Sequence, residues 1–281
     1  MKTLRIAAAA AVLAVSAAAT AATPDPVLVD VVAGDWRKPD DRARDAARHP
    51  VESLTFWGLR PGMTILEVQP GGGWWTDILA PYAARTGGKY YATGPDIDNP
   101  DLSKRGREIR GQMERKFADG KNLYGEVGIV NWGTSSKPLP SNQYDFILVA
   151  RSIHGWMRNE GMVEKAMTEF FNALKPGGVL AIEQHRANPG PQDPVAKSGY
   201  VTEAYVLEQA GKAGFKLDGR SEINANPKDT KDHPFGVWTL PPARISVAYG
   251  SGKDPDPDFD HAPYDAIGES DRMTLRFVKP Q

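Results

Sequence analysis

A carboxylate followed by three glycines is the feature of this 281-residue sequence with the clearest potential for chemistry. Glu67 lies near the end of an apolar run, and Gly71, Gly72 and Gly73 follow before a helical segment begins at Trp74. Glycine has no Cβ, so backbone N–H groups of such a turn can approach a ligand closely. The helix start adds unpaired donors and the positive end of a dipole. A nucleotide-like ligand is therefore expected, with Glu67 accepting from its hydroxyl or ammonium group.

The spacing in this turn excludes two nucleotide-binding patterns and fits a third. A dinucleotide fingerprint needs a glycine where Thr76 stands, and the Gly-Lys-Ser/Thr ending of a phosphate loop is missing. The pattern acid, three residues, Gly, one residue, Gly resembles motif I of class I S-adenosylmethionine-dependent methyltransferases. In that family the loop packs against the methionine part of S-adenosylmethionine, but the usual first glycine is Gln69 here. An ordinary strand-to-helix turn of another α/β protein is the alternative.

Two later segments carry the same resemblance. A buried strand introduced by a Tyr-Asp pair is predicted at Tyr144–Ala150, and Leu-Lys-Pro-Gly-Gly at Leu174–Gly178 precedes another apolar strand. Glycine ends helices in the left-handed conformation and proline prevents their continuation, so this turn is expected to close a helix over Met162–Ala173. The three motifs lie in the family's order, which makes them more specific together than separately.

The resemblance narrows to a family of bacterial predicted methyltransferases that carry signal peptides. The segments that carry it are Arg42–Pro50, Pro70–Thr76, Ile78–Tyr82 and Asp271–Pro280. It covers nearly the whole mature chain, and it implies a fold and a cofactor but no substrate.

Strands alternate with helices along the chain, which predicts a parallel sheet covered by helices on both faces. Strands are expected at residues 64–68, 89–93, 127–131, 146–150, 179–183 and 273–278, with another directly after residues 213–215. Helices are expected at residues 75–84, 102–117, 162–174 and 200–214. Together with the resemblance, this gives an α/β class and a Rossmann-like seven-stranded methyltransferase sheet whose last strand is antiparallel.

The first 22 residues are expected to be a cleaved secretory signal peptide. Lys2 and Arg5 form a basic start, residues 6–15 form an apolar core too short to span a bilayer, and residues 19–21 offer a cleavage site. We therefore expect a periplasmic or secreted protein without a stable membrane anchor. The sequence has no cysteine, which excludes disulfides, zinc–thiolate sites and thiol nucleophiles.

Residues 23–281 are expected to form a single domain. Without the two basic residues of the signal, about 32 basic residues face 35 acidic ones, so no general attraction to nucleic acid is expected. An acidic, proline-rich hairpin insertion is expected at about residues 250–268, and a hairpin arm near the substrate mouth at 224–242. The aspartates of the insertion lack the glycine and distal glutamate of a calcium loop, and no metal site is expected.

A polar helical cap is expected at about residues 30–60, before the first strand. Its charged residues are Arg37, Asp40, Asp41, Arg42, Arg44, Asp45 and Arg48. A solvated helix with ion pairs along its surface is the favoured interpretation. The alternative is a lid over the cofactor, with Asp41, Arg44 or Asp45 facing the pocket.

Ligands of open α/β sheets bind outside the carboxyl ends of the strands. After the second strand the family has an acid that holds the ribose hydroxyls, and Asp96 is the candidate here, although Gly94–Pro95 displaces it and Asp98 is the fallback. After the third strand, Asn131 stands where the family often has an acid near the adenine amino group. Its carbonyl can accept the same hydrogen bond, and Trp132 could stack on the adenine.

Two histidines follow the fourth and fifth strands and are the candidate catalytic residues. His154 could act as a general base on the acceptor because its ordinary pKa lies near 6.5, and His185 could do the same. A structural hydrogen-bonding role is the alternative for both. Methyl transfer requires alignment of the acceptor with the methyl group and, for oxygen or nitrogen acceptors, loss of a proton. No fixed catalytic motif is therefore expected.

The favoured hypothesis is S-adenosylmethionine-dependent methyl transfer to a small molecule or a protein side chain. The alternative is a non-catalytic periplasmic binding protein with a repurposed pocket. It is suggested by the departures at Gln69, around Gly94–Pro95 and at Asn131, and by a cofactor that is made in the cytoplasm. A nicotinamide-dependent oxidoreductase is a third hypothesis, and Thr76 argues against it. The sequence indicates no particular acceptor and no oligomeric state.

Overall fold

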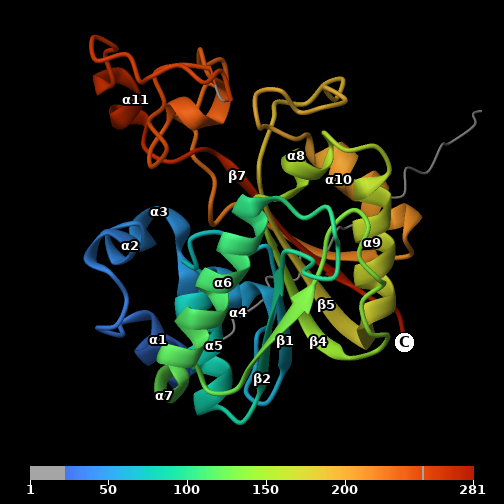
Figure 1. Cartoon of the computed structure of the whole chain (residues 1–281). Helices are drawn as coiled ribbons and strands as arrows, with labels where there is room; N and C mark the ends of the chain where they lie inside the picture. Colours follow the sequence, from blue (N-terminus) through green and yellow to red (C-terminus); the bar gives the residue numbers. More distant parts are fainter. Residues whose placement is uncertain (1–22, 249) are drawn as a thin grey trace, which may run out of the picture.

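The computed structural model describes residues 23–248 and 250–281, so the expected signal peptide lies outside the described residues. Within these residues, seven strands form one sheet in the order β3-β2-β1-β4-β5-β7-β6 (Figure 1). The strands are β1 (Thr64–Val68), β2 (Lys89–Gly94), β3 (Val127–Asn131), β4 (Tyr144–Ala150), β5 (Leu174–His185), β6 (Lys216–Ser221) and β7 (Arg272–Val278).

The direction of the strands agrees with the predicted fold. Neighbouring strands from β3 to β5 are parallel, whereas β7 is antiparallel to both β5 and β6. The predicted seven-stranded sheet with an antiparallel last strand is therefore confirmed. Because β7 runs in the opposite direction, its first residue, Arg272, pairs with His185 at the end of β5. The start of β7 thus joins the sheet edge at which ligands of open α/β folds bind.

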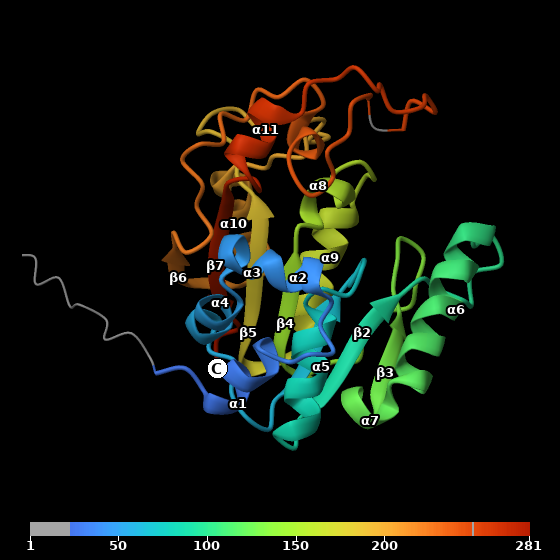
Figure 2. The same cartoon turned by 90° about the vertical axis from the view of Figure 1, so that its left-hand side faces the viewer.

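Helices cover both faces of the sheet. They are α1 (Pro26–Val32), α2 (Pro39–Ala43), α3 (Asp45–Arg48), α4 (Pro50–Trp57), α5 (Thr76–Arg85), α6 (Lys104–Asp119), α7 (Lys121–Tyr124), α8 (Ile153–Trp156), α9 (Met162–Ala173), α10 (Glu203–Lys212) and α11 (Ala262–Ile267). Helices α4, α5 and α6 pack on one face and α9 and α10 on the other (Figures 1 and 2). In the described part of the chain, no helix is long and apolar enough to cross a membrane.

Strand β4 explains why the core has two halves. Its side chains alternate between the faces of the sheet, as they do in any strand. Phe146 and Leu148 join the hydrophobic cluster on the α5 face, and Ile147 and Val149 join the one on the α9 face. All four are fully buried, which is why a continuous apolar run, rather than an alternating one, encodes this central parallel strand.

The turn between α9 and β5 differs in detail from the prediction. The helix ends at Ala173, and Leu174 is already extended, with φ −71° and ψ 142°. The strand therefore begins five residues before the predicted Val179, and Gly177 adopts its left-handed conformation (φ 76°) inside the turn rather than at the helix end. Lys175 fixes this region through an ion pair with Asp145 at 2.8 Å.

The two predicted hairpins are wrong. Between β6 and β7, the described residues form the 3₁₀ helix η1 (Gly236–Thr239) and α11 but no strand. Prolines lack the N–H group that a strand ladder needs, and this segment contains many of them: Pro227, Pro234, Pro241, Pro242, Pro255, Pro257 and Pro263. Pro263 instead occupies the first turn of α11, where no donor is required. Helix α11 and the loops on either side of it, here called the α11 region, lie beyond the carboxyl ends of β4 and β5 (Figures 1 and 2).

Candidate active site

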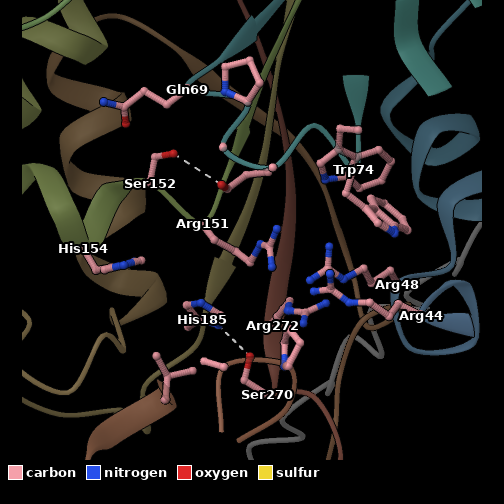
Figure 3. A pocket seen from close by; sticks show the side chains of 18 of the residues that line it. Arg44, Arg48, Gln69, Trp74, Arg151, Ser152, His154, His185, Ser270 and Arg272 are labelled. Atoms are coloured by element: carbon pink, nitrogen blue, oxygen red, sulfur yellow. Dashed lines mark hydrogen bonds between the residues drawn. The ribbon is translucent and has the colours of Figure 1, made fainter. Parts of the chain in front are cut away.

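A cavity of about 500 Å³ lies at the carboxyl ends of β1 and β4. Six parts of the chain line it: Asp41, Arg44 and Arg48 of the cap; Glu67–Gly72 with Trp74 and Trp75; Ala150–Ser152 with His154 and Gly155; His185; Val237–Ala243 without Thr239; and Ser270 with Arg272. The segments are far apart in sequence and meet only because the parallel strands end at one edge (Figure 3).

The loop after β1 has an unusual backbone. Gln69, Gly71 and Gly73 all have positive φ, at 50°, 59° and 84°. A non-glycine residue is uncommon in this region, so Gln69 is held there by its surroundings. Its backbone N–H donates to Thr93 Oγ1 at 2.8 Å, and its side-chain oxygen accepts from Trp156 Nε1 at 2.9 Å. The residue that replaces the family's first glycine thus keeps a conformation that glycine adopts freely.

Glu67 is buried at the base of the cavity. Its Oε2 accepts from the hydroxyls of Thr76 at 2.8 Å and Tyr90 at 2.6 Å. Burial raises the pKa of Glu67 to about 7, although these two hydrogen bonds and the charge of Lys116 oppose the rise. A cationic group in the cavity would favour the ionised form of this carboxylate.

The cap contains two buried arginines, whereas its charged residues Asp40 and Arg42 are exposed. Arg37 and Arg48 are each about 1% exposed, and both guanidinium groups lie over the ring of Trp74, at 5.3 and 4.8 Å. Arg37 pairs with Asp45 at 2.6 Å, and the carbonyl of Asp41 accepts from Trp74 Nε1. The favoured interpretation, a solvated helix with surface ion pairs, therefore holds for only part of the cap: Arg44 pairs with Asp41, but Arg37 and Arg48 are buried. The lid interpretation agrees with the lining for Asp41 and Arg44 but not for Asp45, which is used in the pair with Arg37.

Four arginines converge on the cavity (Figure 3). Glu269 accepts from Arg44 Nε at 2.7 Å, from Arg48 Nε at 2.9 Å and from Arg272 Nη2. Burial raises the pKa of Glu269, but the guanidiniums of Arg272 and Arg44 outweigh it and hold the pKa below its usual value. The fourth, Arg151, follows β4 with a left-handed backbone (φ 58°), and burial lowers the pKa of its guanidinium.

The hydrogen bonds around His154 determine which of its ring nitrogens carries the proton. The side-chain oxygen of Gln184 accepts from the N–H of Ile153, so the Gln184 amide group faces His154 and donates to Nδ1 at 3.2 Å. Burial and the charge of Arg158 lower the pKa of His154 to about 4, so the ring is neutral at pH 7. With Nδ1 accepting, the proton lies on Nε2. This arrangement favours His154 as a hydrogen-bond donor rather than the predicted general base.

His185 is in a similar environment. Its Nδ1 lies 2.6 Å from the hydroxyl of Ser270, and its ring centroid lies 5.6 Å from that of His154. Burial, together with the nearby His154, Arg272 and Arg151, holds the pKa of His185 well below its usual value. The ring is therefore neutral and placed by Ser270, and its predicted catalytic role stays a prediction.

A second cavity lies at the carboxyl ends of β2 and β3, and it contains Asp96 and Asp98. Asn131 also lines it, but both ends of its amide are used. Its oxygen accepts from Arg110 Nη1 at 2.6 Å, and its nitrogen donates to Asp98 at 3.1 Å. The carbonyl predicted to receive the adenine amino group is therefore occupied by Arg110. A ribose contact at Asp96 stays a prediction.

Comparison with known proteins agrees with this geometry. A family profile described as "Methyltransferase domain" matches residues 40–218. The chain belongs to this methyltransferase family. The resemblance to class I S-adenosylmethionine-dependent methyltransferases is thereby confirmed, and with it the prediction of the cofactor.

Two curated relatives are ubiquinone/menaquinone biosynthesis C-methyltransferases UbiE. The protein from Shewanella pealeana is 32% identical over 135 residues, which cover 48% of this chain and 46% of that protein. The protein from Yersinia enterocolitica is 30% identical over 125 residues, 44% and 43% of the two chains. The chain thus matches less than half the length of these relatives. A solved structure, the (4+2)-cyclase SpnF, has a TM-score of 0.52 at 17% identity, covering 91% of this chain and 92% of that one, which shows a shared fold.

The prediction that Trp132 stacks on adenine is wrong. The side chain is 3% exposed and packs against Trp156 and Phe170 in the core on the α9 face, and its Nε1 donates to Glu169 at 2.9 Å. Trp132 follows β3 directly, and its ring enters the core of this methyltransferase instead of the cavity at the strand end.

Sequence reasoning assigned no role to Arg151, Arg272 or Glu269. Arg151 follows the fourth strand directly, so the strand-end rule already selected its position, but no role was assigned to it. Arg272 was considered only as part of the chain's ending, Asp271–Pro280, and Glu269 was not considered. The antiparallel direction of β7, implied by the family resemblance, was the available signal, because it brings the start of that strand to the carboxyl ends of its parallel neighbours.

Proposed function

We propose that this methyltransferase transfers the methyl group of S-adenosylmethionine to a small acceptor molecule that binds in the same cavity. The observation that carries the proposal is the meeting of Glu67, the glycine-containing loop Gln69–Gly72 and the cap at one cavity beside the end of β1. S-adenosylmethionine supplies, when bound, a methyl group already activated by a sulfonium.

The cavity's own residues fit the methionine part of this cofactor. Glu67 offers a buried carboxylate to an ammonium group. At Gly71, the position that a Cβ would occupy has nothing within 4 Å, so the backbone is open to a ligand. Arg44 and Arg48 lie on the cap side of the same space and can hold a carboxylate. The adenosine part is proposed to lie toward the second cavity, with Asp96 near the ribose.

The remaining lining residues position the acceptor. Methyl transfer gains most from holding two reactants in line and excluding water. The cap and the Val237–Ala243 segment close the cavity from two sides. His154, neutral and with its proton on Nε2, can donate a hydrogen bond to an acceptor oxygen or nitrogen.

Calorimetric titration with S-adenosylmethionine and S-adenosylhomocysteine tests donor binding. We expect micromolar binding of both and a loss of binding in Gly71→Val. Gly87→Val is the matched control, because Gly87 also has a positive φ (72°) and nothing within 4 Å of its Cβ position, but it lies outside the cavity. No binding at millimolar concentration would contradict the proposal, and affinity for NAD instead would favour the oxidoreductase.

Transfer itself needs a separate measurement. Radiolabelled methyl groups should move from S-adenosylmethionine to a small-molecule fraction of a cell extract, and S-adenosylhomocysteine should accumulate in equal amount. Binding with neither product would leave the non-catalytic binding protein as the function.

We also propose that the protein is exported to the periplasm. Support comes from the basic start at Lys2 and Arg5, the short apolar core at residues 6–15 and the small residues at 19–21. Cell fractionation followed by N-terminal sequencing should find the protein in the periplasm, starting near residue 22. Recovery of the uncleaved chain in the cytoplasm would refute export.

A further inference from the structure

Three guanidinium groups that line the cavity have buried N–H groups without a hydrogen-bond partner in the described part of the chain. The atoms are Nη1 and Nη2 of Arg48, Nε of Arg151, and Nε and Nη1 of Arg272. Arg48 and Arg272 are each about 1% exposed. An unmade hydrogen bond at a buried charged group costs more than one at a neutral group. The described residues thus leave these arginines incompletely satisfied, and water or an anion is the usual partner of such groups.

The charges of the site also call for an anion. The guanidiniums of Arg44, Arg48, Arg151 and Arg272 outnumber the carboxylates that pair with them, which are Asp41, Glu183 and Glu269. Glu183 Oε1 lies 3.1 Å from Arg272 Nη1, but neither atom has a hydrogen-bond partner among the described residues. S-adenosylmethionine is itself a cation overall, so its binding increases the positive charge. Because Glu67 is matched with the ammonium group of the donor, the second reactant is the remaining source of negative charge for the arginines.

The arginines divide into two pairs by position. Arg44 and Arg48 come from the cap, and Arg48 lies 4.8 Å over the ring of Trp74, next to the glycine loop. This pair is placed for the carboxylate of the methyl donor. Arg151 and Arg272 come from the sheet itself, at the end of β4 and the start of β7, and both charges act on His185. Arg151 has no ion pair with any described residue. Arg151 and Arg272 are therefore available to the acceptor (Figure 3).

We propose that the acceptor carries an oxyanion, either a carboxylate or a phosphoryl group, that Arg151 and Arg272 hold while another atom of the acceptor receives the methyl group. This inference rests on the proposed function. Guanidinium groups bind carboxylate and phosphate through paired, directional N–H···O bonds, which fix orientation as well as position. The oxyanion thus serves as the anchor that aligns the acceptor, while Arg48, the other buried cation of the site, is left to the carboxylate of the donor.

The test uses benzoate and inorganic phosphate as probes and the mature protein with and without saturating S-adenosylhomocysteine. Tryptophan fluorescence or calorimetry reports binding of each probe. We expect at least one probe to bind equally well in both cases, because donor and oxyanion occupy different arginine pairs. Tighter binding of benzoate assigns a carboxylate, and tighter binding of phosphate assigns a phosphoryl group. Competition between S-adenosylhomocysteine and both probes would overturn the inference, because all the arginines would then serve the donor's carboxylate.

Arg151→Asn is the decisive variant. Asparagine tolerates the left-handed backbone at this position, and Arg151 has no described ion pair whose loss would leave a buried charge. We expect the probe's dissociation constant to rise about 10- to 100-fold, the effect of losing a charge-assisted hydrogen bond, with S-adenosylhomocysteine affinity unchanged. In Arg272→Lys, which keeps the charge, the affinity for the probe should fall about tenfold.

Arg85→Gln is the matched control, because Arg85 is exposed and pairs with Asp30 away from the cavity. An unchanged probe affinity in Arg151→Asn, or no binding of either probe to the parent protein, would overturn the inference. Neither result would contradict methyl transfer, since S-adenosylhomocysteine binding is measured separately. Failure of S-adenosylhomocysteine to bind would instead contradict the proposed function.

Discussion

Two stretches of the same sheet edge differ in how their polar groups are satisfied. The covered edge comprises the ends of β1, β4 and β5, over which the cap and the α11 region lie. The open edge comprises the ends of β2 and β3, where Asp98, Arg110 and Asn131 bond to one another. At the covered edge, buried guanidiniums keep unpartnered N–H groups, whereas at the open edge the same kinds of group pair among themselves.

The two edges differ in this way because the cap and the α11 region shield one of them from water. A polar group at an exposed edge can bond to water, so a ligand must displace water to gain anything. A cap removes this competition, and each group left without a partner then becomes a specific demand on the ligand. Charged residues at the covered edge therefore determine which ligand can bind. Changes at the covered edge should accordingly have larger effects than matched changes at the open edge.

The largest effect is expected at Glu269. Glu269→Gln removes the charge that pairs with Arg44, Arg48 and Arg272, and removing one member of a buried ion-pair group costs about 3–5 kcal/mol. Denaturant unfolding at pH 7 measures this loss. Glu222→Gln is the matched control, since Glu222 bonds to Arg186 by both oxygens but its side chain is 68% exposed. It should cost less than about 1 kcal/mol.

The contribution of Glu269 should also depend on pH. Because its pKa is lower in the folded protein than in the unfolded chain, its stabilisation is fully present above the unfolded value of about 4.5. It is lost as the pH falls through the folded value. The difference between Glu269→Gln and the parent protein should therefore shrink as the pH falls below about 4.5. A difference that stays constant down to pH 3 would contradict the ion-pair account.

Glu67 should show the opposite pH dependence. Its pKa is raised to about 7, so between about pH 4.5 and 7 the folded protein holds a proton that the unfolded chain has lost. Stability therefore falls as the pH rises through this range. Glu67→Gln, which keeps an acceptor for Tyr90 and Thr76, should gain up to about 3 kcal/mol relative to the parent protein between pH 4 and 8. If the stability difference between Glu67→Gln and the parent protein did not change with pH, Glu67 would be ionised over the whole range.

Glu67→Gln should also weaken the binding of the methyl donor. A neutral amide cannot balance an ammonium group, so we expect the dissociation constant of S-adenosylhomocysteine to rise about tenfold or more. Calorimetry at pH 8, where Glu67 is ionised, gives the clearest comparison.

At the open edge, Asp96→Asn should raise the dissociation constant of S-adenosylhomocysteine about tenfold, if its carboxylate accepts from the ribose hydroxyls. Asp98→Asn is the control on the same cavity. Because Asp98 is exposed and already accepts from Asn131, its change should alter the constant less than about threefold. Calorimetry of both variants checks the order, and a larger effect at Asp98 would exchange their roles.

The sequence predicted the strands well because their signals are local. β1 and β3 begin and end where the apolar runs do, and the glycine turn marks the cofactor loop. The burial of Arg48 could not be predicted in this way, because its partner Glu269 lies 221 residues further along the chain. The role of His154 depends on Gln184 in the same manner.

The smallest effect, and the sharpest test of the loop, is expected at Gln69. Gln69→Gly relieves a left-handed backbone worth about 1–2 kcal/mol, but it loses the bond to Trp156 and adds freedom to the unfolded chain, each worth about 1 kcal/mol. These contributions nearly cancel, so the stability measured in denaturant should change by less than about 1 kcal/mol. Gly71→Gln is the matched control, because φ at Gly71 is 59° and nothing lies within 4 Å to bond a new side chain. It should destabilise by about 1 kcal/mol. A clearly larger loss in Gln69→Gly than in Gly71→Gln would mean that the Trp156 bond, rather than the backbone, holds the loop in shape.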